Sequence, residues 1–360
     1  MIVSPYTQWK RGGAGLALGA FAGWVCSRLH TPIPWMLGPL VTIAFLRVAG
    51  VRIGSPPGGR QVGQWIIGTS LGLYFTPLVV REVAGWWWLL AVGAVFAIGL
   101  GYGGGVLLAR LAGIDRTTGI FACVPGGAAE MSVLGERFGA RVDRVAAAQS
   151  LRILIVVLTI PFAYAALGLH GADVYVPGAT TFDAGGYAML MAATFGGSVI
   201  AQRLRAPNAF VLGSLAVAIP LTAMHIDLSA TPALASNAGQ CLLGCALGAR
   251  FEPDFLAGAH KFIAAVAATI LVAIAVSAGA AILLAMMTGL HPATIVLGMA
   301  PGGIAEMCIT AKVLQLGVPL VTAFHVTRVV VLLLLTVPLF ERASAWRRAR
   351  NEVYKRGDLE

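Results

Sequence analysis

Charged residues are scarce in this sequence. Only 11% of its 360 residues are Asp, Glu, Lys or Arg, whereas soluble domains carry about 25%. Hydrophobic residues make up 58%, and the mean hydropathy is +0.84. A chain this poor in charge cannot cover the surface of a water-soluble globule of its size. The composition excludes a disordered protein, a secreted disulfide scaffold and a cytosolic enzyme, and it leaves a polytopic membrane protein.

Metal-binding patterns are also missing. The five cysteines are dispersed without zinc or haem spacing, and the six histidines form no H-x-x-H or HExxH pattern. We therefore expect no metal site, no bound cofactor and no enzymatic activity. The expected ions are H⁺ or Na⁺, acting as a coupling ion.

Long apolar segments run along the whole chain. A stretch of about 17–25 apolar residues spans a bilayer as a helix. Such segments lie near 12–29, 33–51, 61–80, 85–110, 117–136, 144–169, 187–202, 207–225, 237–251, 260–288, 293–314 and 319–340. The predicted class is therefore an all-α polytopic membrane protein.

The chain also contains an internal repeat. The motif Pro125-Gly126-Gly127-Ala-Ala-Glu130-Met recurs as Pro301-Gly302-Gly303-Ile-Ala-Glu306-Met, with six of seven positions identical at an offset of 176. This repetition predicts two membrane units, residues 12–169 and 187–340. Residues 170–186 would link them, and residues 341–360 form a basic tail.

The distribution of positive charge predicts the topology. The net charge is +10, and the basic tail favours a cytoplasmic C-terminus. If all six segments of each unit cross, 13 basic residues lie inside and 10 outside. If the PGG segment instead re-enters on one side, the split becomes 20 inside and 3 outside, the three being Arg28, Arg81 and Lys312.

The second topology is favoured because its bias is strong. It gives each unit five transmembrane helices and inverts the second unit relative to the first. Both termini would be cytoplasmic and the linker extracytoplasmic. A different segment, such as 33–51, could be the one that fails to cross.

The PGG motifs interrupt their helices. Unpaired backbone groups are tolerated inside a membrane only where protein or a water-filled cavity covers them. A half-helix is predicted to begin after Gly127 and after Gly303, and its N–H groups would attract an anion. Glu130 and Glu306 would then lie in the first turn. Either they bind a coupling ion or a cationic group, or they cap their own helices.

One arginine is predicted to lie within the last span of each unit. Arg152 and Arg328 would bind an anionic substrate or pair with Glu130 and Glu306. The polar neighbours Gln149 and His325 align with each other in the two units. A proton-transfer role for His325 would therefore be limited to one unit, and the alternative is a hydrogen-bonded structural residue.

The duplicated PGG-x-AEM motif resembles the bacterial membrane AbrB family, also labelled "ammonia monooxygenase". The resemblance covers about residues 12–340 and implies a duplicated membrane protein of some ten spans. The family name has been attached to gene regulation and to ammonia oxidation. These residues contain neither a DNA-reading module nor a His-rich copper site.

Inverted repeats with interrupted helices are typical of secondary transporters. The sequence therefore predicts a transporter of the bacterial inner membrane for a small polar solute, with an organic anion favoured. Binding would occur between the two PGG breaks, coupled to H⁺ or Na⁺. The expected partners are the solute and the lipid bilayer, not nucleic acid, and a homodimer would suit such a machine. The alternative is a membrane-embedded ligand sensor or regulatory scaffold without flux.

Overall fold

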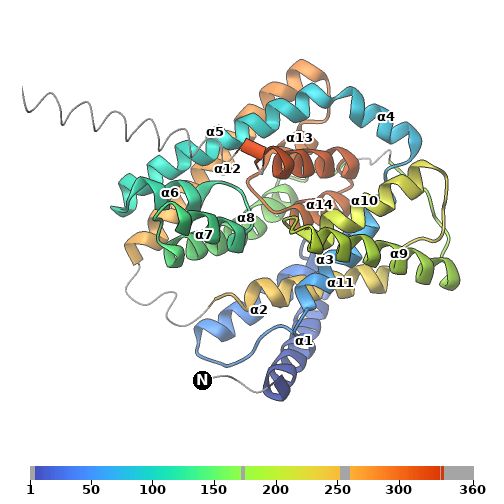
Figure 1. Ribbon diagram of the computed structural model, residues 1–360, viewed down its shortest axis with the longest axis horizontal. Helices are drawn as coiled ribbons and strands as arrows, with labels where there is room; N and C mark the ends of the chain where they lie inside the picture. The colour runs from blue at the N-terminus through green and yellow to red at the C-terminus, as the bar shows by residue number, and fades with distance from the viewer. Residues whose placement is uncertain (1–4, 172–174, 252–259, 333, 336–360) are drawn as a thin grey trace, which may run out of the picture.

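The computed structural model describes residues 5–171, 175–251, 260–332, 334 and 335, and this part of the chain is helical throughout (Figure 1). Its helices are α1 (Pro5–Arg28), α2 (Pro34–Val48), α3 (Gly59–Gly72), α4 (Pro77–Gly85), α5 (Trp87–Ala112), α6 (Arg116–Cys123), α7 (Ala128–Arg137), α8 (Val142–Ala166), α9 (Ala184–Arg203), α10 (Ala209–Ala223), α11 (Ala233–Gly248), α12 (His260–Thr288), α13 (Pro292–Met299) and α14 (Ile304–Val313). A further apolar helix covers Val318–Leu332. The basic tail predicted at 341–360 lies outside the described residues.

Four helices are long and apolar enough to cross a membrane, namely α5, α8, α9 and α12. Helices α3 and α4 meet at an angle of 92° and count as a fifth candidate if they form one broken span. Helices α2, α10 and Val318–Leu332 are apolar but shorter. The predicted all-helical multi-pass class is confirmed, whereas ten crossings stay a prediction.

The bend between α3 and α4 differs from the straight span predicted at 61–80. Helix α3 ends at Gly72, and α4 begins with Pro77 as its first residue. Proline suits the first turn of a helix because its missing N–H would have no partner there. The chain therefore restarts in a new direction although the sequence remains apolar.

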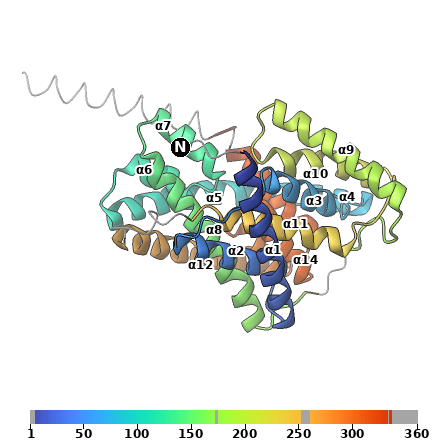
Figure 2. The same cartoon turned by 90° about the horizontal axis from the view of Figure 1, so that it is seen from below.

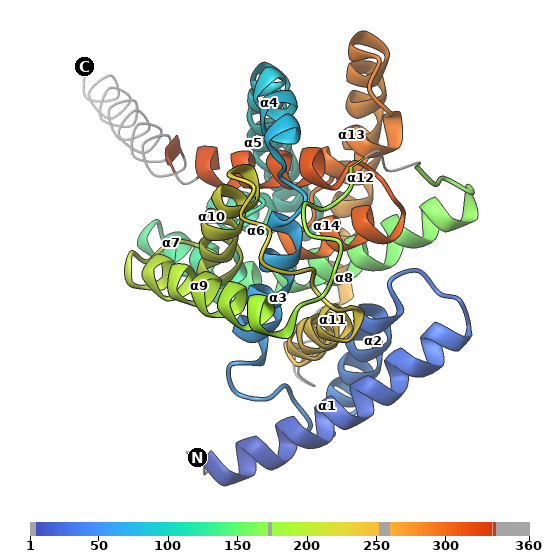
Figure 3. The same cartoon turned by 90° about the vertical axis from the view of Figure 1, so that its right-hand side faces the viewer.

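The helices pack as two bundles. The first bundle contains α1, α2, α3, α9, α10 and α11, and the second contains α5, α6, α7, α8, α12, α13 and α14 (Figures 1 and 2). Helix α4 connects them, since it contacts both α10 and α5. Figure 3 shows α1, α2 and α11 together, on the far side of α14 from α5.

Small residues bring the helices of the first bundle close together. A Cβ at Gly244 of α11 would collide with the carbonyl of Met36 on α2, and one at Gly72 of α3 would collide with Ala218 of α10. Close backbone approach through such residues is characteristic of helix packing in membranes. Two pairs, α2 with α11 and α3 with α10, thus connect the N-terminal and C-terminal halves of the chain.

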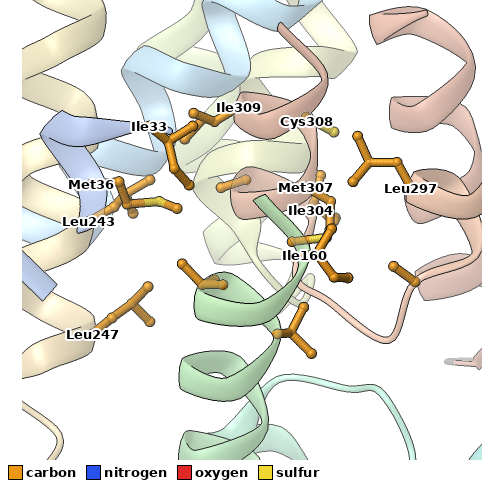
Figure 4. Packing of buried hydrophobic residues seen from close by; sticks show 14 of the residues in the cluster. Ile33, Met36, Ile160, Leu243, Leu247, Leu297, Ile304, Met307, Cys308 and Ile309 are labelled. Carbon is orange, nitrogen blue, oxygen red and sulfur yellow. The ribbon is translucent and has the colours of Figure 1, made fainter. Parts of the chain in front are cut away.

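A large apolar cluster lies at the interface between the bundles (Figure 4). Ile33 and Met36, at the start of α2, belong to one buried cluster with Ile304 and Met307 of α14. Ile160 of α8 joins the same cluster. Apolar contacts of this kind are not directional. This cluster therefore holds the two bundles together without polar pairs that would fix one relative position.

Candidate functional site

Each PGG motif lies between two short helices. Helix α6 ends at Cys123 and α7 begins at Ala128, while α13 ends at Met299 and α14 begins at Ile304. The interruptions therefore cover 124–127 and 300–303, hereafter the first and second breaks. Half-helices follow Gly127 and Gly303, as the sequence predicts.

The glycines of each motif make room for the Glu and Met that follow. A Cβ at Gly126 would overlap the Met131 side chain, and one at Gly302 would overlap Met307. In the same way, a Cβ at Gly127 or Gly303 would overlap the carboxylate of the glutamate three residues later, Glu130 or Glu306. The recurrence of Gly-Gly with Glu-Met thus has a packing cause in both breaks.

The two glutamates fold back over the starts of their helices but differ in burial. The Gly127 N–H donates a hydrogen bond to Glu130 Oε2 at 3.1 Å, so Glu130 caps α7. Glu130 is exposed, whereas Glu306 retains only 8% of its accessible surface. Glu306 also interacts electrostatically with Arg152, Arg250 and Arg328. Of the two, Glu306 is therefore the carboxylate inside the protein.

The two arginines hydrogen-bond to the backbone of the breaks. Arg152 donates from Nη1 to the Val124 carbonyl and from Nη2 to the Gly126 carbonyl, both at 3.3 Å. Arg328 donates in the same way to Ala300 at 2.8 Å and to Gly302 at 2.5 Å. Each guanidinium thus donates to two carbonyls of its break, where the regular pattern of helix hydrogen bonds is interrupted.

Pairing with Glu130 or Glu306 was one of two alternatives for these arginines, and neither arginine forms such an ion pair among the described residues. Within the described part of the chain, the ion pairs join Arg141 and Arg144 to Asp143. Both Nε atoms of the central arginines are buried without a hydrogen-bond partner among the described residues.

Gln149 and His325 also form hydrogen bonds with backbone carbonyls at or near the end of the helix that precedes each break. Gln149 Nε2 donates to the carbonyls of Phe121 and Val124, each at 2.9 Å. His325 Nε2 lies 3.1 Å from the Leu297 carbonyl, which follows Phe121 by the same offset of 176. Because a carbonyl only accepts, Nε2 carries the proton of the neutral ring. Both residues therefore support the ends of interrupted helices.

A narrow cavity lies between the breaks. Four of the predicted site residues line it, Pro125, Arg152, Pro301 and Arg328, with α5 and α12 along its sides. Its volume is about 30 Å³, enough for roughly two water molecules. Glu130, Glu306, Gln149 and His325 do not line it.

The family described as "Transition state regulatory protein AbrB" matches residues 35–344. This range is most of the chain and contains both PGG motifs. The chain belongs to the AbrB family.

Two curated proteins are similar to this AbrB-family member. "Uncharacterized protein YhjN" of Bacillus subtilis (strain 168) is 27% identical over 353 residues, covering 90% of this chain and 91% of that protein. "Putative regulator AbrB" of Escherichia coli (strain K12) is 29% identical over 129 residues, covering 36% of this chain and 37% of that protein.

This AbrB-family member has two further partly buried basic residues, Arg250 and Lys312, that were not among the predicted site residues. Arg250, which follows α11, acts electrostatically on Glu306 and on Arg60. Lys312 of α14 donates a hydrogen bond to Ser70 Oγ of α3 at 2.7 Å. The only sequence signal for Lys312 is its position among the three basic residues assigned to the outer side.

Proposed function

We propose that this AbrB-family protein is a secondary transporter built from two inverted repeats. It would move a small polar solute, with an organic anion favoured, across the bacterial inner membrane. The observation that carries the proposal is the shared cavity, because two interrupted helices from distant parts of the chain border one buried space together with two arginines. Interrupted helices that meet at a common site are typical of secondary transporters.

Matching contacts in the two halves support the duplication. The Arg152 and Arg328 forks engage carbonyls at the same offset of 176, as do Gln149 and His325. The reciprocal pairs α2–α11 and α3–α10 also exchange partners between the halves. A two-fold relation between the units accounts for both patterns.

The charges around the breaks favour an anionic solute. Arg152 and Arg328 are each 5% exposed and lie at the cavity wall. Their net positive charge would attract an anion, and each retains an Nε–H without a partner among the described residues. The breaks also lead directly into half-helices, whose N-terminal N–H groups favour negative charge.

Transport requires the site to open, because about two waters fill the cavity as it stands. The apolar cluster at the interface between the bundles permits one bundle to shift against the other. Glu306 lies on α14, at this interface, and is the carboxylate best placed to carry the coupling H⁺ or Na⁺. Glu130 would have the weaker role because it is exposed and caps its helix.

The test is uptake into proteoliposomes. Radiolabelled acetate, lactate, succinate and citrate would be supplied with an imposed proton or sodium gradient. Glu306→Gln should abolish accumulation driven by the gradient, while the matched variant Glu136→Gln, an exposed carboxylate on α7, should behave as wild type. Fully coupled uptake by both Glu306→Gln and Glu130→Gln would remove the coupling role.

A regulatory role is the second candidate, favoured by the descriptions of the matching family and of the E. coli relative. In that case the buried site would bind a ligand without flux, and the tail would recruit a partner. Deletion of 343–360 distinguishes the two roles. A regulator should lose its output when the tail is deleted, even though its pocket is intact. A transporter should keep its uptake.

A further inference from the structure

A second and larger cavity lies between the two bundles. It is bounded by the end of α3, the start of α11, the C-terminal half of α14 and the chain near 177–179 and 230–231. Its volume is about 440 Å³, within the range of about 300–1,000 Å³ typical of small-molecule sites. Unlike the cavity between the breaks, it already has room for a solute.

One positive charge enters this cavity. Lys312 is half-buried, hydrogen-bonds to Ser70, and lies 5.8 Å from the centre of the Tyr74 ring. No Asp or Glu is among the lining residues. The ion pairs of the described residues are formed elsewhere, on Asp143. A cation held away from bulk water without a counter-charge is costly unless an anion accompanies it.

The opposite wall offers neutral hydrogen-bonding groups. Ser236, Asn237 and Gln240 of α11 line it, together with Thr231 just before that helix. The Thr231 hydroxyl is buried and has no hydrogen-bond partner among the described residues. Hydroxyl and amide groups both donate and accept, so this wall can bind the second carboxylate oxygen or a hydroxyl of a ligand.

We propose that this cavity binds a small organic monoanion, with Lys312 on its carboxylate and the α11 side chains on its other polar groups. A single ammonium among the lining residues matches a single negative charge, and lysine suits it as a compact point charge. Binding of the anion at this site does not depend on the proposed transport function. Only the idea that the bound anion is also moved across the membrane rests on that function.

This site accounts for the position of Lys312 in the predicted topology. Lys312 is one of three basic residues that the charge distribution assigns to the outer side. A role in ligand binding explains why Lys312 lies on the outer side, where the positive-inside pattern predicts few basic residues. Because Lys312 belongs to the second bundle and Ser70 to the first, a bound anion would also replace a hydrogen bond that joins the bundles.

The experiment measures binding on the purified full chain. The monoanions acetate and lactate are titrated as sodium salts at constant ionic strength against sodium chloride, and thermal stability is followed. At least one carboxylate should raise the Tm of the wild type and of Lys261→Met, which removes an exposed lysine on α12. In Lys312→Met the apparent Kd should weaken ~10-fold or more, as expected for a lost charge-assisted hydrogen bond.

Lys312→Arg provides the second variant. It preserves the charge and should retain binding within roughly an order of magnitude, which separates loss of the ligand site from loss of the fold. The proposal is overturned if no carboxylate stabilises the wild type or if Lys312→Met binds as wild type. Binding without uptake would leave this site standing and remove the transport function. Uptake that is unchanged in Lys312→Met would leave the transport function standing and remove this site from it.

Discussion

Removing the Arg328 side chain tests whether the breaks depend on their arginines. In Arg328→Met the carbonyls of Ala300 and Gly302 lose donors at 2.8 and 2.5 Å. The site is enclosed, since Arg328 is 5% exposed. Water therefore cannot easily replace the guanidinium, and the second break would have to rearrange.

The expected loss follows from the two acceptors. Each buried polar group left without a partner costs about 1–3 kcal/mol, or about 2–6 kcal/mol for the pair. Side-chain hydrogen bonds in membrane proteins average about 0.6 kcal/mol, which sets a lower bound near 1 kcal/mol. At roughly 2 °C per kcal/mol, this range of about 1–6 kcal/mol corresponds to a fall in apparent Tm of about 2–12 °C.

The assay is thermal unfolding of the detergent-solubilised protein at one scan rate. Arg328→Lys should lie between the methionine variant and the wild type, because one ammonium cannot reproduce the two-pronged geometry. Arg152→Met should cost less, since its bonds are longer at 3.3 Å. Arg81→Met, an exposed arginine on α4, is the control. An Arg328→Met protein that melts within about 1 °C of this control would refute the structural role.

Two further outcomes follow from the same geometry. Gly244→Ala should destabilise the protein by about 1–3 kcal/mol in denaturant or thermal unfolding, because its Cβ would collide with the backbone carbonyl of Met36 on α2. Gly279→Ala in α12 meets nothing within 4 Å and should be neutral or stabilising, so equal losses would contradict the packing argument. In the linker, Thr180→Cys should react with a membrane-impermeant maleimide added outside intact cells. Labelling only from the cytoplasmic side would overturn five crossings per unit.

The sequence predicted the helices well because hydropathy and helix-breaking residues act locally. The apolar run at 260–288 coincides with α12, and the Pro-Gly-Gly triplets separate α6 from α7 and α13 from α14. The bend between α3 and α4 escaped prediction since hydropathy carries no directional information. The run at 61–80 stays apolar through the change of direction.

The partners of the charged residues could not be read from the sequence. The sequence leaves open whether Arg152 pairs with a glutamate or binds a substrate. In the structure its acceptors are backbone carbonyls 26 and 28 residues away, in the first break. Every residue has a carbonyl, so no side-chain pattern identifies these acceptors. Lys312 was counted as a residue of an outer loop because only the folded chain brings it to Ser70 and the start of α11.

The guanidinium forks have a consequence for the ions that the breaks can accept. In many interrupted helices, exposed carbonyl oxygens and helix C-termini coordinate Na⁺. Here the carbonyls of Val124, Gly126, Ala300 and Gly302 already face a positive charge, which would repel a metal cation. We therefore expect the breaks not to bind a metal cation unless an arginine moves away, so that a coupling Na⁺ would need oxygen ligands from carboxylates instead.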